Sequence, residues 1–572
     1  MKQKEFTILQ IIFFSSFFVF GLFMEYAACF YTALYGMFLL YRKRPWILHR
    51  NVETMAILSM TFFSFLSVFY GVDWGMSLIG CVRMLGILFF MEILMQLTVE
   101  ERLILVKRIP SVGVCMTVIG MTAFPFPPAH GFFYVADRLG GFFQYPNVYA
   151  LFCLTGIIIL LEYFNGEKKE KFFQKNVCKI LVLLSGILLS GSRIVFFLTL
   201  VSLAALILHK KINRKLLLPS LAVFVLIPCI FYWMGNTQNL GRIITTSLSS
   251  STLLGRFIYA KDCFSLILRH PFGLGYLGYY YREPEIQTAL YSVRFVHNDY
   301  LQLALDYGWI PCICILVLFI KTVLSHKYSF ESRLLFAVWG IHLFFDFDME
   351  FMSMWYLLLL FVDFNYGKEL YLPMSGESGT AGRTKQRVIP SLVTVSVFLA
   401  LYLSAGMLPR YIGRADWSSS ILPFYTESNA ELLSQEKDIG KAKALALKIK
   451  KQNPYVPECY DILTVASFME GRYEEMAVYK KKAIQLQKYN LDAYEKYLMF
   501  LSKAIDSANT KGDMGTVVKL LPLVTEVPEL LDDVEKNTTP LAFKTKDIPQ
   551  FELSEDMQVY IKQVEAFLKT LQ

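Results

Sequence analysis

Two residue types that could carry out group transfer occur together between residues 255 and 301. Arg256 opens an apolar-periodic segment, and His297 stands in the run Val296-His297-Asn298-Asp299-Tyr300-Leu301. An arginine guanidinium binds phosphate oxygens through two parallel N–H groups. Histidine is the usual acceptor of a hydroxyl proton near neutral pH. This stretch therefore predicts that a phosphorylated donor is bound and that its group is transferred to an acceptor hydroxyl.

Two further arginines and a glycine-rich turn extend this set. Arg138 lies in the segment DRLGGFFQYPNVYA (137–150), and Arg193 ends the run Ser190-Gly191-Ser192-Arg193 between two apolar stretches. At a membrane boundary, a cation in that position needs a partner or an anionic ligand. The turn HPFGLGY (270–276) contains Gly273 and Gly275, and glycine allows a loop backbone to turn tightly.

The elements that must position these residues are apolar. Of the 572 residues, 55% are hydrophobic and 18% are charged, whereas soluble domains have about 25% charged residues. The excess ends near Leu408, after which charged residues become frequent. These proportions exclude a soluble multidomain enzyme, a disulfide scaffold and a disordered chain. We expect an all-α protein in which a transmembrane helical bundle (1–407) precedes a helical domain (408–572).

About 12–13 membrane spans are expected, because a crossing helix needs about 20 apolar residues. The candidate spans are 6–24, 26–41, 54–72, 75–98, 109–124, 147–164, 177–190, 193–208, 216–235, 300–323, 332–345, 351–366 and 388–407.

The distribution of Lys and Arg predicts the orientation of the bundle. With the N-terminus in the cytoplasm, alternate gaps collect the basic residues, and the gaps on the other side have almost none, as cytoplasmic loops require. The net charge of +9 is thereby explained without nucleic-acid binding. A long loop (236–299), in which we expect the catalytic residues, and the C-terminal domain then lie outside the cytoplasm.

The C-terminal domain contains a repeat of the tetratricopeptide period. Pro457-Glu458-Cys459-Tyr460 recurs as Leu491-Asp492-Ala493-Tyr494, 34 residues later. Between these copies, a Gly471-Arg472 turn precedes the expected second helix. We predict a small array of helical hairpins that binds a protein partner; simple hairpins without a ligand are the alternative.

Taken in order, these segments resemble the O-antigen ligase and O-antigen polymerase (Wzy-type) superfamily of bacterial membrane glycosyltransferases. The resemblance spans roughly 135–365 and is strongest at 255–310, where Arg256, a helix, HPFGLGYLGYY and HNDYLQLALDYGW follow one another. The segments at 137–150 and 190–193 resemble two upstream signatures of the family. The segment HLFFDFDMEF (342–351) resembles a downstream element of members with a tetratricopeptide tail.

The resemblance implies a multi-pass protein of the bacterial inner membrane that uses an undecaprenyl-diphosphate-linked oligosaccharide as donor. Transfer would take place outside the cytoplasm, with inversion, without a metal ion and without a cofactor. The acceptor would be a glycan, a lipid or a protein. Carried over residue by residue, the donor diphosphate would be bound by Arg138, Arg193 and Arg256. His297 would orient or deprotonate the acceptor hydroxyl, and the supporting residues would be Asn147, Asn298, Gly273 and Gly275.

Several interpretations stay open at this level. Asp346 and Asp348 would either complete the site, as a base or an arginine partner, or be solvated at the membrane interface. The tyrosines around Tyr280 (276, 279, 280 and 281) would either stack on sugar rings or anchor the loop at the interface. Two rival functions are a transporter or flippase of lipid-linked sugars and a membrane scaffold that recruits a partner through its tail. Within the enzyme interpretation, polymerase and ligase are not separated.

Overall fold

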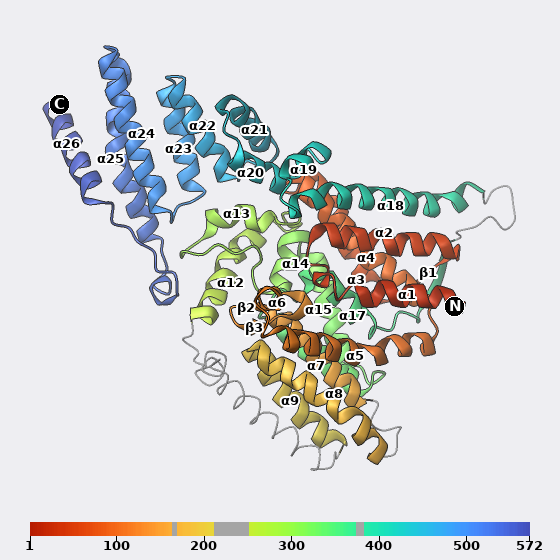
Figure 1. Cartoon of the computed structure of the whole chain (residues 1–572). Coiled ribbons are helices and arrows are strands. Elements are labelled where there is room, and N and C mark those ends of the chain that lie inside the picture. The colour runs from red at the N-terminus through yellow and green to blue at the C-terminus, as the bar shows by residue number, and fades with distance from the viewer. Residues whose placement is uncertain (163–168, 211–250, 373–382, 572) are drawn as a thin grey trace.

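The chain folds almost entirely into helices in a computed structural model that describes residues 1–162, 169–210, 251–372 and 383–571. An N-terminal bundle is followed by a row of helices that extends away from it (Figure 1). Two short antiparallel pairs, β1 with β4 and β2 with β3, are the strands of the described residues. The prediction of an all-α polytopic bundle with a helical C-terminal part is confirmed.

The described elements of the bundle run from α1 to α18, with the strands between them. Their bounds are α1 Gln3–Ser15, η1 Phe20–Leu22, α2 Glu25–Arg42, β1 Trp46–Arg50, α3 Val52–Tyr70, α4 Trp74–Met95, α5 Val99–Ala123, α6 Pro127–Phe133, β2 Tyr134–Val135, β3 Arg138–Leu139, η2 Gly141–Phe143, α7 Pro146–Glu162, α8 Lys169–Ser190, α9 Arg193–Lys210, α12 Ser251–Arg269, α13 Gly278–Ile286, α14 Asp299–Tyr307, α15 Trp309–Leu324, α16 Phe330–His342, η5 Asp348–Glu350, α17 Met352–Leu359, β4 Lys368–Leu372 and α18 Arg383–Tyr411.

Among the described residues, four helices are long and apolar enough to cross a membrane, namely Val52–Tyr70, Trp74–Met95, Val99–Ala123 and Val388–Tyr411. Shorter apolar helices are Pro146–Glu162, Asn176–Ser190, Arg193–Leu206 and Trp309–Leu324. Capping fixes where some of them begin: the Asn51 side chain accepts from the backbone N–H of Thr54 at the start of α3, which satisfies one of the donors left free at a helix start. The candidate span 216–235 lies outside the described residues.

Three candidate spans are not single helices. In the first, 6–24, the helix ends at Ser15. A tight turn with positive φ at Phe20, Gly21 and Leu22 follows. The span 300–323 is broken at Gly308, whose φ is 91°, so that α14 and α15 are separate helices. The last, 351–366, contains only the eight-residue helix α17. Apolar composition predicted these runs correctly, but it contains no signal for such breaks.

The segments between apolar runs that are rich in Lys and Arg lie at one end of the bundle. Arg42 lies near Glu5, Arg102 donates to the backbone carbonyl of Val362, and Lys321 pairs with Glu53 at 3.0 Å. Strand β1 pairs with β4 at this end, where the N-terminus also lies (Figure 1). The segments with the candidate catalytic residues lie at the opposite end, which agrees with the alternation of charged and uncharged gaps.

The C-terminal helices form hairpins that stack into a row (Figure 1). Their bounds are α19 Ala415–Ile421, α20 Thr426–Gln435, α21 Ile439–Gln452, α22 Pro457–Met469, α23 Tyr473–Gln485, α24 Leu491–Thr510, α25 Met514–Lys536, η6 Ala542–Lys544 and α26 Glu555–Leu571. Helices α22 and α24 begin one predicted repeat length apart. The helical hairpins are present as expected, and their assignment as tetratricopeptide repeats stays a prediction.

Asp73, the residue directly before α4, contacts the row of hairpins. Asp73 caps α4 by accepting from the backbone N–H groups of Gly75 and Met76. Its carboxylate also accepts from Asn453 at 3.1 Å and from Gln452 at 3.1 Å. A single buried carboxylate therefore fixes both the start of a long apolar helix and the position of the C-terminal hairpins beside it.

Candidate active site

Asp346 is the centre of a polar cluster at the end of the bundle opposite the basic gaps. Its side chain is fully buried in the turn between α16 and η5. Oδ1 accepts from the Tyr145 hydroxyl at 2.7 Å and lies 3.3 Å from His297 Nδ1. Oδ2 accepts from Asn147 Nδ2 and from Arg256 Nη2, the latter at 3.3 Å. Four side chains from separate elements therefore converge on one carboxylate.

The charges around Asp346 keep it ionised. Burial alone would raise the pKa of this carboxyl, because a charged group is less stable away from water. The Arg256 guanidinium and the His297 ring outweigh burial and hold the pKa of Asp346 well below its usual range. Asp346 is thus a hydrogen-bond acceptor and the arginine partner, which selects one of the two interpretations left open by the sequence.

His297 is held in an unusual backbone conformation. Its φ is 57°, a left-handed value that costs a non-glycine residue roughly 1–2 kcal/mol. On one side, the Val296 N–H donates to Gln302 at 3.1 Å. On the other side, Asn298 caps α14 by accepting from Leu301 N–H at 3.0 Å. These contacts fix the backbone on both sides, so that the imidazole faces Asp346.

The imidazole of His297 also packs against a ring. Its centroid lies 4.8 Å from that of Phe347 in an edge-on arrangement, and 22% of its side chain is exposed. If Nδ1 carries the proton that is shared with Asp346, the lone pair of Nε2 is available to a substrate. The arrangement can therefore act as a base toward a hydroxyl group that approaches from the exposed side.

The three candidate arginines reach this cluster to different extents. Arg256, on α12, contacts Asp346 directly, and 24% of its side chain is exposed. Arg138, on β3, donates from Nη2 to Asn147 at 2.8 Å and from Nε to the Ser190 carbonyl at 2.7 Å. It is linked to Asp346 through Asn147. Arg193 is the first residue of α9, three residues after the Ser190 carbonyl that Arg138 contacts.

Of the remaining predicted residues, Asn298 contacts the segment before Asp346, and the two glycines lie elsewhere. Asn298 donates from Nδ2 to the Phe344 carbonyl at 3.2 Å, which ties the His297 segment to the segment that precedes Asp346. Gly273 and Gly275 have φ values of 84° and 79°. A Cβ on Gly273 would lie 2.6 Å from the Asp306 backbone. The glycine turn therefore packs on the C-terminal end of α14, and the structure does not bring it to Asp346.

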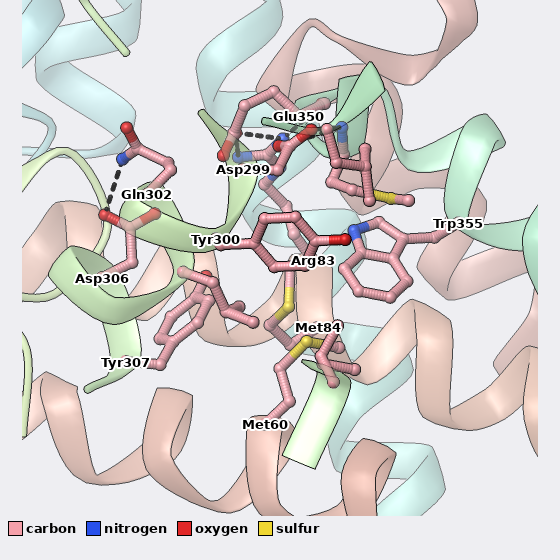
Figure 2. Close-up of a pocket in the computed structure, with 14 residues that line it drawn as sticks. Met60, Arg83, Met84, Asp299, Tyr300, Gln302, Asp306, Tyr307, Glu350 and Trp355 are labelled. Carbon is pink, nitrogen blue, oxygen red and sulfur yellow. Dashed lines mark hydrogen bonds and ion pairs between the residues drawn. The ribbon is translucent and has the colours of Figure 1, made fainter. Parts of the chain in front are cut away.

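A second buried cluster, formed around Arg83 and Glu350, lies where η5 follows the turn that carries Asp346 (Figure 2). Arg83 on α4 donates to the Glu350 carboxylate at 3.1 Å and to its backbone carbonyl at 2.8 Å. The guanidinium also lies over the Tyr276 ring, 4.4 Å from its centroid. The cavity beside it, about 30 Å³, has room for a water molecule only. We therefore interpret this cluster as structural support.

Sequence reasoning did not select Tyr145, Arg83 or Glu350. Tyr145 lies inside the segment 137–150 that carries the resemblance, two residues before Asn147. Arg83 is the one basic residue within the apolar run 75–98, and a charge in a membrane span requires a partner. A signal was therefore present for both. In the ranges that the structure describes, no group of three or more His, Cys, Asp or Glu residues is placed to hold a metal ion.

A family of known proteins matches part of the chain. The sequence model of the family described as O-antigen ligase matches residues 179–316. Residues 179–316 therefore resemble an O-antigen ligase domain. The resemblance to the O-antigen ligase and polymerase superfamily is thereby confirmed, and the matched residues include Arg193, Arg256 and His297. No curated protein and no solved structure matches the chain.

The match to the O-antigen ligase family supports glycan transfer at a membrane as the broad activity of the chain. Together with the apolar helices, it indicates a multi-pass protein of the inner membrane. Its substrates are, in general terms, a lipid-linked glycan and an acceptor. Asp346 and Arg138 lie outside the matched segment, so the site combines the O-antigen ligase domain with elements before and after it.

Proposed function

We propose that the protein transfers a glycan from an undecaprenyl-diphosphate-linked donor to an acceptor hydroxyl on the extracytoplasmic side of the membrane. The observation that carries this proposal is the contact of both His297 and Arg256 with the buried Asp346 carboxylate. His297, which is suited to accept a proton, and Arg256, which is suited to bind a phosphate, both contact the Asp346 carboxylate. Transfer from a diphosphate requires both at the same place.

His297 acts on the acceptor in this mechanism. The Asp346 carboxylate accepts a hydrogen bond from Nδ1–H of His297, so that Nε2 takes the proton of the acceptor hydroxyl as its oxygen attacks the anomeric carbon. The bond between that carbon and the diphosphate oxygen breaks, and the diphosphate leaves with the electron pair. Inversion at the anomeric carbon follows from a single displacement. General-base assistance of this kind contributes about 10²–10⁴ in rate.

The arginines act on the donor. Arg256 has exposed surface beside the cluster, and Arg138 donates to the Ser190 carbonyl, three residues before Arg193 at the start of α9. Guanidinium groups bind the oxygens of a diphosphate and neutralise the charge that grows as it leaves. Asp346 and Asn147 hold two of these side chains in place. The proposed donor site uses no metal ion and no cofactor.

The proposed mechanism is tested by replacing His297 with Gln in the full-length protein. We expect glycan transfer to fall by about two orders of magnitude or more while the protein remains in the membrane. The matched control is His326→Gln, in the exposed turn between α15 and α16, which should transfer normally. Normal transfer by His297→Gln would contradict the proposed role.

Deletion of the gene separates polymerase from ligase. Surface glycans that lose their long chains, with single repeats still attached, would identify a polymerase. Complete chains that remain on the carrier lipid would identify a ligase. Normal glycans on both measures would instead favour a transporter or a scaffold that other proteins can replace.

A further inference from the structure

A groove of about 800 Å³ lies between the outer-loop helix α13 and the C-terminal hairpins. Five tyrosines line it: Tyr280, Tyr281 and Tyr291 from the segment 278–292, and Tyr455 and Tyr489 from the loops before α22 and α24. The volume is within the range of ligand sites, about 300–1,000 Å³. Because its two walls come from the two halves of the chain, the groove exists only when the C-terminal hairpins are docked on the outer loop.

Ion pairs hold the two walls together. Arg294 donates to Glu25 of α2 at 2.6 Å and lies 3.5 Å from Glu427 of α20. Arg410, in the wall of the groove, pairs with Glu427 at 3.3 Å and with Glu431 at 2.9 Å. Arg410 is thereby neutralised by carboxylates of the groove itself. The wall also contains Glu458, so that three carboxylates (Glu427, Glu431 and Glu458) face the single Arg410 and the balance of charge is acidic.

The other polar groups of the groove are amides and hydroxyls. The amides of Gln287, Gln487 and Asn490 line it together with the hydroxyls of Ser292, Thr426 and Ser434. Amide and carboxylate groups exchange hydrogen bonds with hydroxyls, and tyrosine rings present flat apolar faces with a polar edge. Sugar rings have the matching surface, since one face carries C–H groups and the rim carries hydroxyls. Anionic sugars, by contrast, would be repelled by the carboxylates.

We propose that this groove binds an uncharged glycan of several sugar units and aligns it with the transfer site. The proposal rests on the proposed function, since it assigns the groove to a substrate of that reaction. The four tyrosines that are adjacent in the sequence have different positions. Tyr276 and Tyr279 are fully buried, whereas Tyr280 and Tyr281 line the groove.

A row of rings connects the groove with the base. The Tyr291 ring, in the groove, lies 4.5 Å from the Tyr259 ring, measured between centroids. The Tyr259 ring lies 6.2 Å from the imidazole of His297. Tyr291 is also fixed through its hydroxyl, which donates to Asp262 at 2.8 Å. Tyr291 therefore connects the groove to His297 through one intervening ring.

Binding is tested with purified full-length protein and an array of neutral, amino-sugar and acidic oligosaccharides as the probe. We expect selective binding of neutral members and at least a tenfold loss in Tyr280→Ala and in Tyr455→Ala. Tyr280→Leu keeps the apolar volume without the ring and should show the same loss. The control Phe567→Ala removes a ring of α26 that is 48% exposed and should bind normally. Preference for acidic members, or unchanged binding by the three variants, would overturn the proposal, as would binding of peptides alone.

A second measurement separates this proposal from the proposed mechanism. The His297→Gln protein should bind the neutral oligosaccharides like the wild type, because His297 does not line the groove. In a transfer assay with Tyr280→Leu, a raised KM for the acceptor with unchanged kcat assigns the bound glycan to the acceptor. A raised KM for the lipid-linked donor assigns it to the donor. If both KM values are unchanged, the groove has no part in transfer and the proposal fails.

Discussion

His297 Nδ1 lies 3.3 Å from Asp346 Oδ1, although 49 positions separate the two residues in the chain. Only the first of them belongs to the segment that matches the O-antigen ligase family. The carboxylate is fully buried, while the imidazole keeps an exposed edge. A buried anion that orients a partly exposed imidazole is the arrangement by which histidine becomes an effective base.

Asp346→Asn should abolish most of the activity without changing the size of the side chain. An amide has one acceptor oxygen and no charge, so it cannot serve His297 and Arg256 together. We expect transfer to fall by about two orders of magnitude or more, measured as glycan formed per amount of membrane protein.

The control for this variant is Asp363→Asn, an exposed carboxylate at the opposite end of the bundle. Its glycan yield should equal that of the wild type. Should Asp346→Asn transfer normally, His297 would not depend on this carboxylate, and the proposed pairing would be wrong.

Arg256→Lys tests the proposed binding of phosphate by a planar group. Lysine keeps the charge but loses the paired N–H donors that match phosphate oxygens. Transfer should fall at least tenfold while the amount of protein in the membrane stays the same. Arg269→Lys, at the exposed end of the same helix, is the matched control. Equal activity of the two variants would mean that Arg256 does not bind the donor.

Much of the fold could be predicted because it depends on composition. Apolar runs predicted where α2, α3, α4 and α7 lie, and the basic gaps predicted which ends of the helices meet. The breaks at Ser16 and Gly308 could not be predicted in this way. They depend on positive φ values and on contacts with distant segments, such as the hydrogen bond from Trp309 N–H to the Pro271 carbonyl.

The site was predictable in its residue types but not in its connections. Arg256 and His297 could be selected because arginine and histidine have chemistry that apolar segments lack. That Asp346 joins them is a property of the tertiary structure, since α12, the turn before α14 and the turn after α16 meet there. The link between Arg83 and Glu350 spans 267 positions, and a single sequence contains no pairing signal over such a separation.

Arg83→Met should reduce the amount of folded protein. It would leave the Glu350 carboxylate buried without its cation, and breaking a buried pair in this way costs about 3–5 kcal/mol. The double variant Arg83→Met with Glu350→Gln removes the charge as well and should recover part of the lost protein. Fluorescence-detected size exclusion of a tagged full-length protein measures both. A single variant that is as abundant as the wild type would exclude a supporting role for this pair.

The proposed orientation predicts which surface residues a membrane-impermeant thiol reagent reaches in intact cells. Ser292→Cys, at an exposed position of the groove, should be labelled from outside. His326→Cys, also exposed but at the basic end, should be labelled only after the membrane is permeabilised. The unsubstituted protein gives the background from its ten native cysteines. Labelling of the second position alone in intact cells would reverse the orientation and contradict extracytoplasmic transfer.

The stability of the outer loop should depend on pH through Glu283. Burial raises the pKa of this carboxyl to about 8, although the Val293 N–H and Gln287 donate hydrogen bonds to it. A carboxyl whose pKa is raised by folding binds its proton more tightly in the folded state. Folded stability therefore falls as pH rises from the ordinary pKa toward 8, by at most about 1.4 kcal/mol per pH unit.

Glu283→Gln keeps an oxygen that can accept from Val293, at 3.1 Å in the wild type, and removes the ionisable group. The apparent Tm of the variant, measured relative to that of the wild type at the same pH, should rise as pH increases from 5 to 9. Thermal unfolding of the purified proteins at several pH values measures it. The exposed neighbour Glu285 provides the control Glu285→Gln, for which we expect no such trend. A constant difference between Glu283→Gln and the wild type would mean that this carboxyl ionises as freely in the folded protein as in the unfolded chain.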